Sequence, residues 1–402
     1  MSQNELSPPI LVEDADGLAA LVEDLEGQSE IAIDTEADSF YSYREKVCLV
    51  QVTVEDRDYV VDPLAGFDLS PMREVLADPG KIKVFHDGEY DVLILKRDHD
   101  LDFAGLFDTR VAAATLGMEA PGLASVLGDR FDVAIDKSMQ RSDWAKRPLT
   151  EKQIRYARLD THYLLPLMHA LRPELDERGR SMIVDTECRR LEALTPQVPQ
   201  FRPDEFVKIK GVRRLPQSEW QFMRELYALR EELASRSDVP PFRIMRNPIL
   251  LDLAHAQPGT LDDLVETPGF SPRMVRSFGK RVLETIAHAR TLDLLERLPV
   301  LPKRDGTEGM NEAEIELYDR LKKWRKGIAG EQQVEASYLL NRHVMARIAH
   351  ARPGNAEALA TIDGFCEWQT DMFGAQLLDL IVAFERALDS GEIPKRKPWR
   401  RR

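Results

Sequence analysis

A chain of 402 residues is too long for one ordinary hydrophobic core, so two or three domains are expected. Hydrophobic residues make up 43% of the sequence and charged residues 31%, a globular composition that excludes wholesale disorder. The net charge of −14 disfavours a nucleic-acid partner on average, although steering depends on where the charges lie.

The composition also bears on the compartment. The three cysteines are far apart in the sequence, so neither a disulfide framework nor a cysteine-based zinc site is predicted. No apolar run reaches the roughly 18 residues that a membrane span requires. The N-terminus carries acids where a signal peptide would carry basic residues. We therefore expect a cytoplasmic protein that does not bind a membrane.

The first half of the sequence alternates between segments typical of strands and of helices. Helices are expected after Gly17, after Asp87, over 108–116, and over 150–171, where Thr150 opens a capping box. Four segments rich in β-branched residues are expected to be strands, namely 31–33, 47–54, 59–61 and 82–85. This pattern predicts an α/β domain, a sheet packed with helices, over residues 1–195.

The second half lacks strand signals and contains an internal repeat. Arg230 recurs as Arg325, an offset of 95 residues, and many other residues recur in the same register without a gap. Examples are Pro258-Gly259 with Pro353-Gly354, Gly269-Phe270 with Gly364-Phe365, and Phe278-Gly279 with Phe373-Gly374. We expect two copies of one helical module, over 210–295 and 310–390, followed by a basic tail over 391–402. Both repeated glycines before Phe270 and Phe365 are predicted to adopt a positive φ.

Asp34 and Glu36 form the first part of a predicted site. Alternate residues of a strand point to the same face, so both carboxylates project together. Acidic pairs at this spacing are common by chance. Unpaired charges in a half-buried strand are costly, however, and two like charges repel unless a cation lies between them.

Two later segments complete the set. Asp91 lies about one turn into the helix expected after Asp87, where the plain alternative is capping of that helix. Tyr156 and Asp160 are four residues apart and share one helical face, although an ordinary neighbour pair would look the same. Each segment alone is weak evidence.

Together these residues are suited to phosphodiester hydrolysis. Four carboxylates can hold two divalent ions roughly 3.5–4 Å apart around one phosphate. A set of oxygen ligands favours Mg²⁺ or Mn²⁺ over zinc, which usually takes His or Cys. The phenol of Tyr156, with a pKa near 10 in free form, is better suited to orienting water than to accepting its proton.

The arrangement of these motifs resembles the DEDDy class of 3′-5′ exonucleases. Asp34-Thr-Glu36, His86 with Asp91, and Tyr156 with Asp160 are similar to the three motifs of that class in order and spacing. Flanking segments resemble the ribonuclease D family, namely Cys48-Leu-Val-Gln51, Asp108-Thr-Arg110, Asp143-Trp144 and Arg147-Pro148-Leu149. The repeated module resembles the HRDC domain of the same family.

The resemblance implies a fold and an activity. It implies a ribonuclease H-like exonuclease domain, a mixed sheet with flanking helices, followed by two all-α HRDC-like domains. Asp34, Glu36, Asp91 and Asp160 would bind two Mg²⁺ or Mn²⁺ ions, and Tyr156 would place the attacking water. The implied activity is that of a 3′-5′ exoribonuclease, which releases nucleoside 5′-monophosphates from tRNA precursors and other small structured RNAs.

Four further residues are predicted to contact the substrate: Thr35, His86, Trp144 and Arg147. Core packing of Trp144 and a backbone-bonded His86 are equally consistent with the sequence. Asp108 is expected to be a helix N-cap, and His162 a bystander on another helical face. Two alternative functions remain open: a DNA-directed 3′-5′ exonuclease of the same class, or an inactive RNA-binding scaffold. The sequence leaves open whether the HRDC modules bind RNA or protein.

Overall fold

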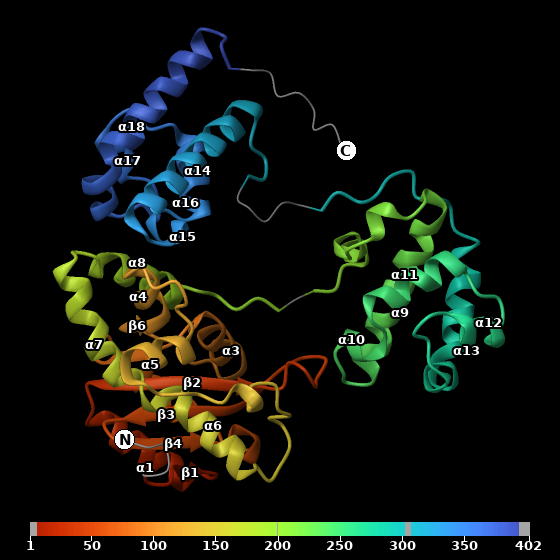
Figure 1. Ribbon diagram of the computed structural model, residues 1–402, viewed down its shortest axis with the longest axis horizontal. Helices are drawn as coiled ribbons and strands as arrows, with labels where there is room; N and C mark the ends of the chain where they lie inside the picture. The colour runs from red at the N-terminus through yellow and green to blue at the C-terminus, as the bar shows by residue number, and fades with distance from the viewer. Residues whose placement is uncertain (1–5, 199, 302–306, 394–402) are drawn as a thin grey trace.

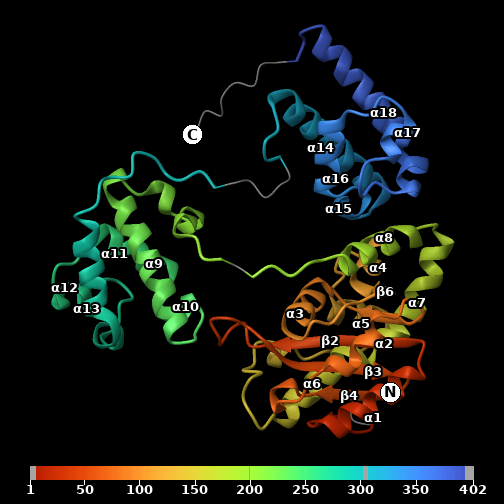
Figure 2. The same cartoon turned by 180° about the vertical axis from the view of Figure 1, so that it is seen from behind.

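The computed structural model describes residues 6–198, 200–301 and 307–393. Figures 1 and 2 show a part built around a sheet, from which the chain continues into two groups of helices. Most of the predicted basic tail, from residue 394 on, lies outside the described residues. Among the residues described, no helix combines the length and the apolar content needed to span a bilayer.

A six-stranded mixed sheet forms the centre of the N-terminal domain. Its strands are β1 (Ile10–Val12), β2 (Glu30–Ala37), β3 (Val47–Val54), β4 (Arg57–Val61), β5 (Ile82–Phe85) and β6 (Leu106–Asp108), in the order β1-β4-β3-β2-β5-β6. Only β3 runs antiparallel to its neighbours, whereas β1–β4, β2–β5 and β5–β6 pair in parallel. The predicted α/β class is confirmed.

Helices cover both faces of this sheet. One face packs against α1 (Ala15–Glu26), α2 (Arg73–Ala77) and α3 (Glu89–His99), and the other against α4 (Thr109–Thr115), α6 (Glu151–His162), α7 (Leu164–Glu177) and α8 (Ser181–Glu192). A further helix, α5 (Leu123–Phe131), precedes α6. Ile31 and Ile33 of β2 belong to the core on the α1 side, while Ala32 belongs to the core on the α7 side. The alternation therefore directs the even-numbered residues of β2 toward α6 and α7.

Several predicted boundaries need correction. The expected helix over 150–171 is two helices, because α6 ends at His162 and α7 begins at Leu164. The capping box at Thr150 is confirmed. Strands β1 and β6 were not predicted, because each is held by a parallel neighbour distant in the sequence, and the strands expected at 31–33 and 59–61 extend over 30–37 and 57–61. Asp87 is not the N-cap of α3; Gly88 is, while Asp87 itself adopts a φ of 67°.

Each half of the repeat forms a small group of helices. The first contains α9 (Trp220–Arg236), α10 (Pro241–Ile244), α11 (Asn247–Ala256), α12 (Leu261–Glu266) and α13 (Pro272–Ala289). The second contains α14 (Glu312–Gln332), α15 (Ala336–Leu339), α16 (Arg342–Ala351), α17 (Ala356–Ala360) and α18 (Glu367–Asp389). The predicted helical character of this half is confirmed.

The two modules also repeat their internal contacts. His255 Nδ1 lies 2.9 Å from Glu219 Oε1, and the equivalent His350 Nδ1 lies 2.9 Å from Glu314 Oε1. The predicted positive φ is confirmed at both equivalent glycines, Gly269 (76°) and Gly364 (78°). The offset of 95 residues found in the sequence therefore also relates equivalent positions in the folded modules.

The modules contact the N-terminal domain differently. The first has its own core, whereas the second shares a continuous hydrophobic core with α4, α7 and α8. The indole Nε1 of Trp368 in α18 donates to Thr186 Oγ1 of α8 at 2.9 Å. The first module instead meets the loop after β2, where the Tyr43 hydroxyl donates to Glu231 Oε1 at 2.6 Å. The second module is thus docked by apolar packing and the first by a polar contact.

Candidate active site

Strand β2 places Asp34 and Glu36 on the face of the sheet that α6 covers. Asp34 is paired with Gln51 of β3, and Glu36 with Leu49. Directly opposed residues of antiparallel strands share a face, and Leu49 packs in a cluster with Ala157 of α6. The two predicted acids therefore project between the sheet and this helix.

Asp91 enters the site through a tight turn between β5 and α3. A Cβ atom added at Gly88 would lie 2.6 Å from Phe85 Cβ, so glycine permits the close approach that starts the helix. Asp91 follows in the first turn of α3, where it is 6% exposed. The hydroxyl of Thr35, next to Asp34 in β2, donates a hydrogen bond to Asp91 Oδ1. This bond ties the second acidic segment to the first.

Helix α6 supplies Tyr156 and Asp160. Ala157, on the inward face between them, is buried against the sheet. The ring of Tyr156 lies 6.0 Å, centroid to centroid, from that of the buried Trp144. The spacing of four residues thus puts both predicted groups on one side of α6, as expected.

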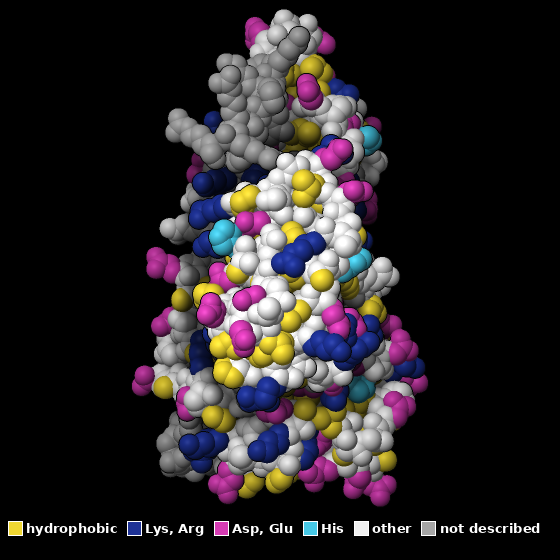
Figure 3. All heavy atoms as spheres, turned by 90° about the vertical axis from the view of Figure 1, so that its right-hand side faces the viewer, with side chains coloured by type: hydrophobic (Ala, Val, Ile, Leu, Met, Phe, Trp, Pro, Cys, Tyr) yellow, Lys and Arg dark blue, Asp and Glu magenta, His cyan; other side chains and the backbone are white. Residues whose placement is uncertain are grey.

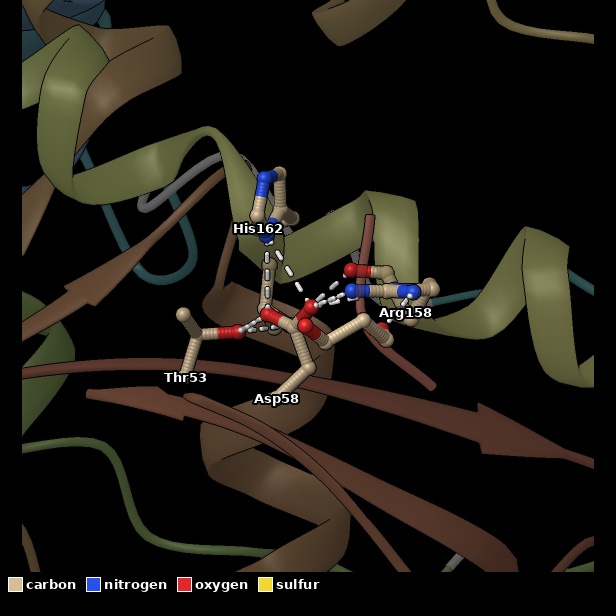
Figure 4. A network of polar contacts seen from close by, with 6 residues as sticks. Thr53, Asp58, Arg158 and His162 are labelled. Carbon is tan, nitrogen blue, oxygen red and sulfur yellow. Dashed lines mark hydrogen bonds and ion pairs between the residues drawn. The ribbon is translucent and has the colours of Figure 1, made fainter. Parts of the chain in front are cut away.

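A buried polar network fixes α6 to strand β4 (Figure 4). Arg158 forms an ion pair with Asp58, and the side chain of His162 lies with Nδ1 3.0 Å from both oxygens of the same carboxylate. Thr53 Oγ1 completes the network by donating to Asp58 Oδ1 at 2.8 Å. Burial favours the protonated acid, but the hydrogen bonds from His162, Arg158 and Thr53 hold the pKa of Asp58 below its usual value. His162 therefore belongs to this network, in agreement with its predicted place outside the catalytic set.

A pocket of about 320 Å³ opens above these residues. Four of the five predicted catalytic residues line it, and so do Thr35, His86, Arg110, Lys137 and Gln140. The fifth, Asp91, is not among the lining residues. The three acidic segments, distant in the sequence, are thus brought to one cavity and its immediate surroundings.

The carboxylates lie within one another's electrostatic field. Burial, followed by the charges of Asp91, Asp160 and Glu36, raises the pKa of Asp34 well above its usual value. Burial and then Asp160 and Asp91 raise the pKa of Glu36 to about 9. Burial and then Asp91 raise the pKa of Asp160 to about 8, and burial raises the pKa of Asp91 to about 6. Such clustered like charges are unstable without protons or cations.

The donor set fits hard divalent cations. In the described parts of the chain, no group of three or more His, Cys, Asp or Glu side chains is already arranged to hold an ion. Mg²⁺ needs no such group, because it keeps several waters and usually takes one or two carboxylates. Four carboxylates with raised pKa values, one of them buried and three partly exposed, satisfy that requirement and lack the nitrogen or sulfur ligands that zinc prefers.

Two of the four predicted substrate contacts fit the pocket. Thr35 and His86 both line it. Burial lowers the pKa of His86 to about 4, so its imidazole is neutral near pH 7. Its Nδ1 lies 2.9 Å from Thr109 Oγ1, while its Nε2 is buried without a hydrogen-bond partner among the described residues. Contact of these two side chains with a substrate stays a prediction.

The other two predicted contacts are wrong. Trp144 is 1% exposed and packs in the core beneath Tyr156, so no base can stack on it. Arg147 donates to both carboxylate oxygens of Asp62 and to the carbonyl groups of Trp144, Lys146 and Cys48. These bonds occupy all five of its N–H donors, which leaves none for a phosphate.

Asp108 has the role that the sequence predicted, whereas Arg110 was not among the predicted site residues. Asp108 caps α4, as expected, by accepting from the backbone N–H groups of Arg110 and Val111. Arg110 was not predicted as a site residue, yet its side chain lines the pocket together with Lys137. The segment Asp108-Thr-Arg110 carried the signal for Arg110, whereas nothing in the sequence marked Lys137.

Comparison with known proteins identifies both kinds of domain. A family model described as 3′-5′ exonuclease matches residues 9–176, and one described as HRDC domain matches 220–286 and 314–381. Ribonuclease D of Zymomonas mobilis is 32% identical over 379 residues, which cover 92% of this chain and 93% of that protein. The chain belongs to the ribonuclease D family. It is accordingly a 3′-5′ exoribonuclease with an N-terminal exonuclease domain and two HRDC domains.

Other relatives agree with this assignment. The exosome complex exonuclease RRP6 of Saccharomyces cerevisiae is 32% identical over 298 residues, which span 70% of this chain and 41% of that longer protein. Among solved structures, RNase D of Escherichia coli, described as an exoribonuclease involved in structured RNA processing, matches with a TM-score of 0.64 and 25% identity over 97% of this chain and 100% of its own. The catalytic core of RRP6 from Trypanosoma brucei matches with a TM-score of 0.67 and 29% identity over 73% of this chain and 82% of its own. The predicted family and fold are confirmed.

Proposed function

We propose that this ribonuclease trims the 3′ ends of tRNA precursors and other small structured RNAs by a two-metal-ion mechanism. Asp34, Glu36, Asp91 and Asp160 would hold two Mg²⁺ or Mn²⁺ ions, and Tyr156 would orient the attacking water. One observation carries the proposal: acids from three separate segments raise one another's pKa values at one pocket. Bound ions would neutralise that repulsion.

The chemistry follows from the donor set. When bound, two divalent cations lower the pKa of a coordinated water and stabilise the leaving 3′ oxygen. The chain's own groups do the positioning. Thr35 holds Asp91 by its hydrogen bond, and the Asp58 network holds α6 with its two catalytic groups. Lys137 at the pocket would supply positive charge for the scissile and neighbouring phosphates.

Tyr156 acts as a hydrogen-bond donor in this scheme. Burial and then the charges of Asp160, Glu36 and Asp34 raise the pKa of its phenol above the ordinary range. The hydroxyl therefore keeps its proton at physiological pH, and it is suited to fixing the orientation of a water and not to removing its proton.

RNA is the proposed substrate because the family is one of exoribonucleases, and because the E. coli relative is described as acting in structured RNA processing. The choice of tRNA precursors, the release of nucleoside 5′-monophosphates and a cytoplasmic location are part of the same proposal. All three cysteines are free, which agrees with a reducing compartment. The domain division at 1–195, 210–295 and 310–390 also belongs to the proposal, supported by the separate core of the first module.

The test compares matched RNA and DNA oligonucleotides with labelled 5′ ends in Mg²⁺ or Mn²⁺. The wild-type protein should shorten RNA stepwise from the 3′ end and release 5′-monophosphates. Asp34→Asn and Asp160→Asn should abolish hydrolysis and keep the circular dichroism spectrum of the wild type. Faster degradation of DNA than of RNA would identify DNA as the substrate. Full activity of a protein that carries both Asp34→Asn and Asp160→Asn would show that the catalytic residues are misassigned. Binding of RNA without any hydrolysis would indicate a scaffold.

A further inference from the structure

An exposed row of aromatic and arginine side chains leads from the active-site pocket to the first HRDC module. We call this row the aromatic–arginine track. Its members are Phe40, Tyr41 and Arg141 of the exonuclease domain, and Phe242, Arg243 and Arg246 of the first module. The track belongs to two domains that are far apart in sequence, so it exists only in the folded protein.

The track starts at the edge of the pocket. Gln140 lines the pocket, and the next residue, Arg141, lies with its guanidinium carbon 5.6 Å from the ring centroid of Phe40. Phe40 itself follows β2 by three residues, and β2 carries the catalytic acids. The Tyr41 hydroxyl donates to the Arg141 carbonyl oxygen at 3.0 Å. These contacts place the start of the track next to a residue that lines the active-site pocket.

The track then crosses to the first module. The guanidinium carbon of Arg243 in α10 lies 4.2 Å from the ring centroid of Tyr41. Tyr43 fastens the same junction, with its backbone N–H donating to Asp238 Oδ1 at 3.2 Å and its hydroxyl donating to Glu231. Phe242 is the neighbour of Arg243 in this short helix. Phe242, Arg243 and Arg246 line one groove of the first module, and Arg243 connects this groove to Tyr41.

The aromatic members are exposed in an unusual way. Phe40 is 42% exposed and Phe242 is 49% exposed. An exposed phenylalanine has no role in a core, but its ring offers a face on which a nucleic-acid base can stack. Phe40, next to Arg141, and Phe242, which lines a groove of the first module with Arg243 and Arg246, match the composition of single-strand binding surfaces.

The positive charges of the track are not neutralised by carboxylates. Arg141, Arg243 and Arg246 form no ion pair with a carboxylate in the part of the chain that the structure describes. The cleft toward the second module differs, because there Arg110 lies 3.6 Å from Asp87 Oδ2 and Arg190 pairs with Glu187 at 2.8 Å. The outward side of the first module shows acidic, basic and hydrophobic side chains interspersed (Figure 3). Free guanidinium groups thus favour the track as the place for phosphates.

The internal repeat provides a natural comparison. At the offset of 95 residues, Phe242, Arg243 and Arg246 correspond to Ser337, Tyr338 and Asn341 of the second module. Tyr338 is 7% exposed, and its hydroxyl accepts a hydrogen bond from Arg110 of the exonuclease domain at 3.1 Å. The same helical position therefore serves docking in one module and stays exposed, with aromatic and cationic side chains, in the other.

We propose that the aromatic–arginine track binds the single-stranded RNA segment on the 5′ side of the nucleotide held in the active-site pocket. Bases stack on Phe40 and Phe242, and phosphates pair with Arg141, Arg243 and Arg246. This assignment rests on the proposed exoribonuclease function. It also suggests how a chain with a net charge of −14 retains a polyanion, because three arginines without a carboxylate partner lie along the proposed path of the strand.

The length of the substrate tests the proposal. The full chain and its Phe242→Ala and Arg246→Glu variants are assayed with single-stranded RNAs of about 3 and about 20 nucleotides, since only the longer strand reaches across the track. For the longer RNA, kcat/KM should fall about tenfold or more through KM. For the shorter RNA, it should stay within about twofold of the wild type, because the chemistry is untouched.

Binding is measured separately in EDTA, where hydrolysis stops. Fluorescence anisotropy with the longer RNA should show weaker affinity for both variants, and Arg246→Glu should reduce the salt slope by about 0.7 for each phosphate that the protein no longer binds. Ser337→Ala, at the position equivalent to Phe242, is the matched control. Arg297→Glu is the control for the change of charge, because Arg297 lies far from the track. The neighbouring residues 295–296 contact Gln217 just before the start of α9, whereas the track residues of the first module follow the end of that helix.

The outcomes separate the two proposals. An equal decrease of kcat/KM for the short and the long RNA in the two variants, or no decrease for either RNA, would overturn the track. The wild-type protein could hydrolyse no RNA while the Phe242→Ala and Arg246→Glu variants still bind RNA more weakly in EDTA. That result would support the track and contradict the proposed catalysis. A loss of RNA affinity in Arg297→Glu as large as that in Arg246→Glu would show that any change of charge weakens binding, and this result would also overturn the track.

Discussion

Arg158 and Asp58 form a buried ion pair that joins helix α6 to strand β4. Their side chains are 9% and 1% exposed. Arg158 lies between Tyr156 and Asp160 in the sequence, and its Nη1 also donates to the Ser7 carbonyl oxygen at 2.6 Å. The pair therefore fixes the rotation of α6 about its axis, which determines where the two proposed catalytic groups point.

Removal of Asp58 should damage both stability and activity. Asp58→Ala leaves the Arg158 guanidinium buried without its partner, a change that costs about 3–5 kcal/mol of unfolding free energy. Urea denaturation measures that loss, and kcat should fall because α6 is no longer fixed. Asp56→Ala, in the exposed turn just before β4, is the control and should stay within about 0.5 kcal/mol of the wild type. Equal stability of the two variants would contradict the role of the pair.

The metal-free protein should lose stability as the pH rises. The pKa is raised to about 9 for Glu36 and about 8 for Asp160, whereas unfolded carboxyl groups titrate near about 4. Between these limits the folded state binds more protons than the unfolded state, so the unfolding free energy falls with rising pH. Thermal unfolding in EDTA at several pH values between about 5 and 9 should show this decline. Glu36→Gln should flatten the pH dependence.

Added Mg²⁺ should reverse that decline. Ions and protons compete for the same carboxylates, so the stabilisation by Mg²⁺ should grow with pH. The measurement is the difference in Tm with and without Mg²⁺ across the same pH series, compared between wild type and Asp34→Asn. A Tm difference that is independent of pH, or equal in the variant, would show that ions do not bind at these acids.

The strands at the site were predictable because their residues carry strong local signals. The predicted bounds of β3 and β5, 47–54 and 82–85, agree with the structure, since both segments are rich in β-branched residues and limited by turn residues. β1 and β6 have three residues each and are fixed by their parallel neighbours, which no local pattern reveals. The break at Tyr163 between α6 and α7 had a local signal that the prediction missed, because Pro166 has no N–H for the His162 carbonyl and fits only in the first turn of a new helix.

The predictions for the site divide in the same way: those that rest on local spacing hold, and those that depend on distant contacts do not. The spacing of Asp34 with Glu36 and of Tyr156 with Asp160 determines a shared face, so the structure brings each pair together as expected. The positions of Trp144 and Arg147 depend on burial among distant residues, and there the sequence left core packing and RNA contact equally open. Arg147 is committed to Asp62, which lies 85 residues earlier in the chain.

Tyr156→Phe should separate catalysis from binding. Loss of the hydroxyl removes the group proposed to orient water, so kcat should fall by about 10²-fold while KM changes little. The ring keeps its place beside Trp144, and the thermal unfolding temperature should therefore be nearly unchanged. Tyr59→Phe, whose hydroxyl donates to Asp24 Oδ2 at 2.6 Å, is the matched control with full kcat. A similar kcat for both variants would remove Tyr156 from the mechanism.

Docking of the second HRDC module should depend on Trp368. This residue is 9% exposed, packs in the core shared with α8, and donates to Thr186. Its equivalent in the first module, 95 residues earlier, is the exposed Arg273, which explains why apolar docking occurs in only one of the modules.

Trp368→Ala should therefore lower the unfolding free energy by about 3–5 kcal/mol and speed proteolysis at α8. Arg273→Ala, the matched control, should stay within about 0.5 kcal/mol of the wild type, because it removes no buried contact. Deletion of 312–402 should expose the same apolar surface of α8 and cause aggregation, which size-exclusion chromatography would detect. A monomeric, fully stable truncated protein would show that the shared core contributes nothing to the exonuclease domain.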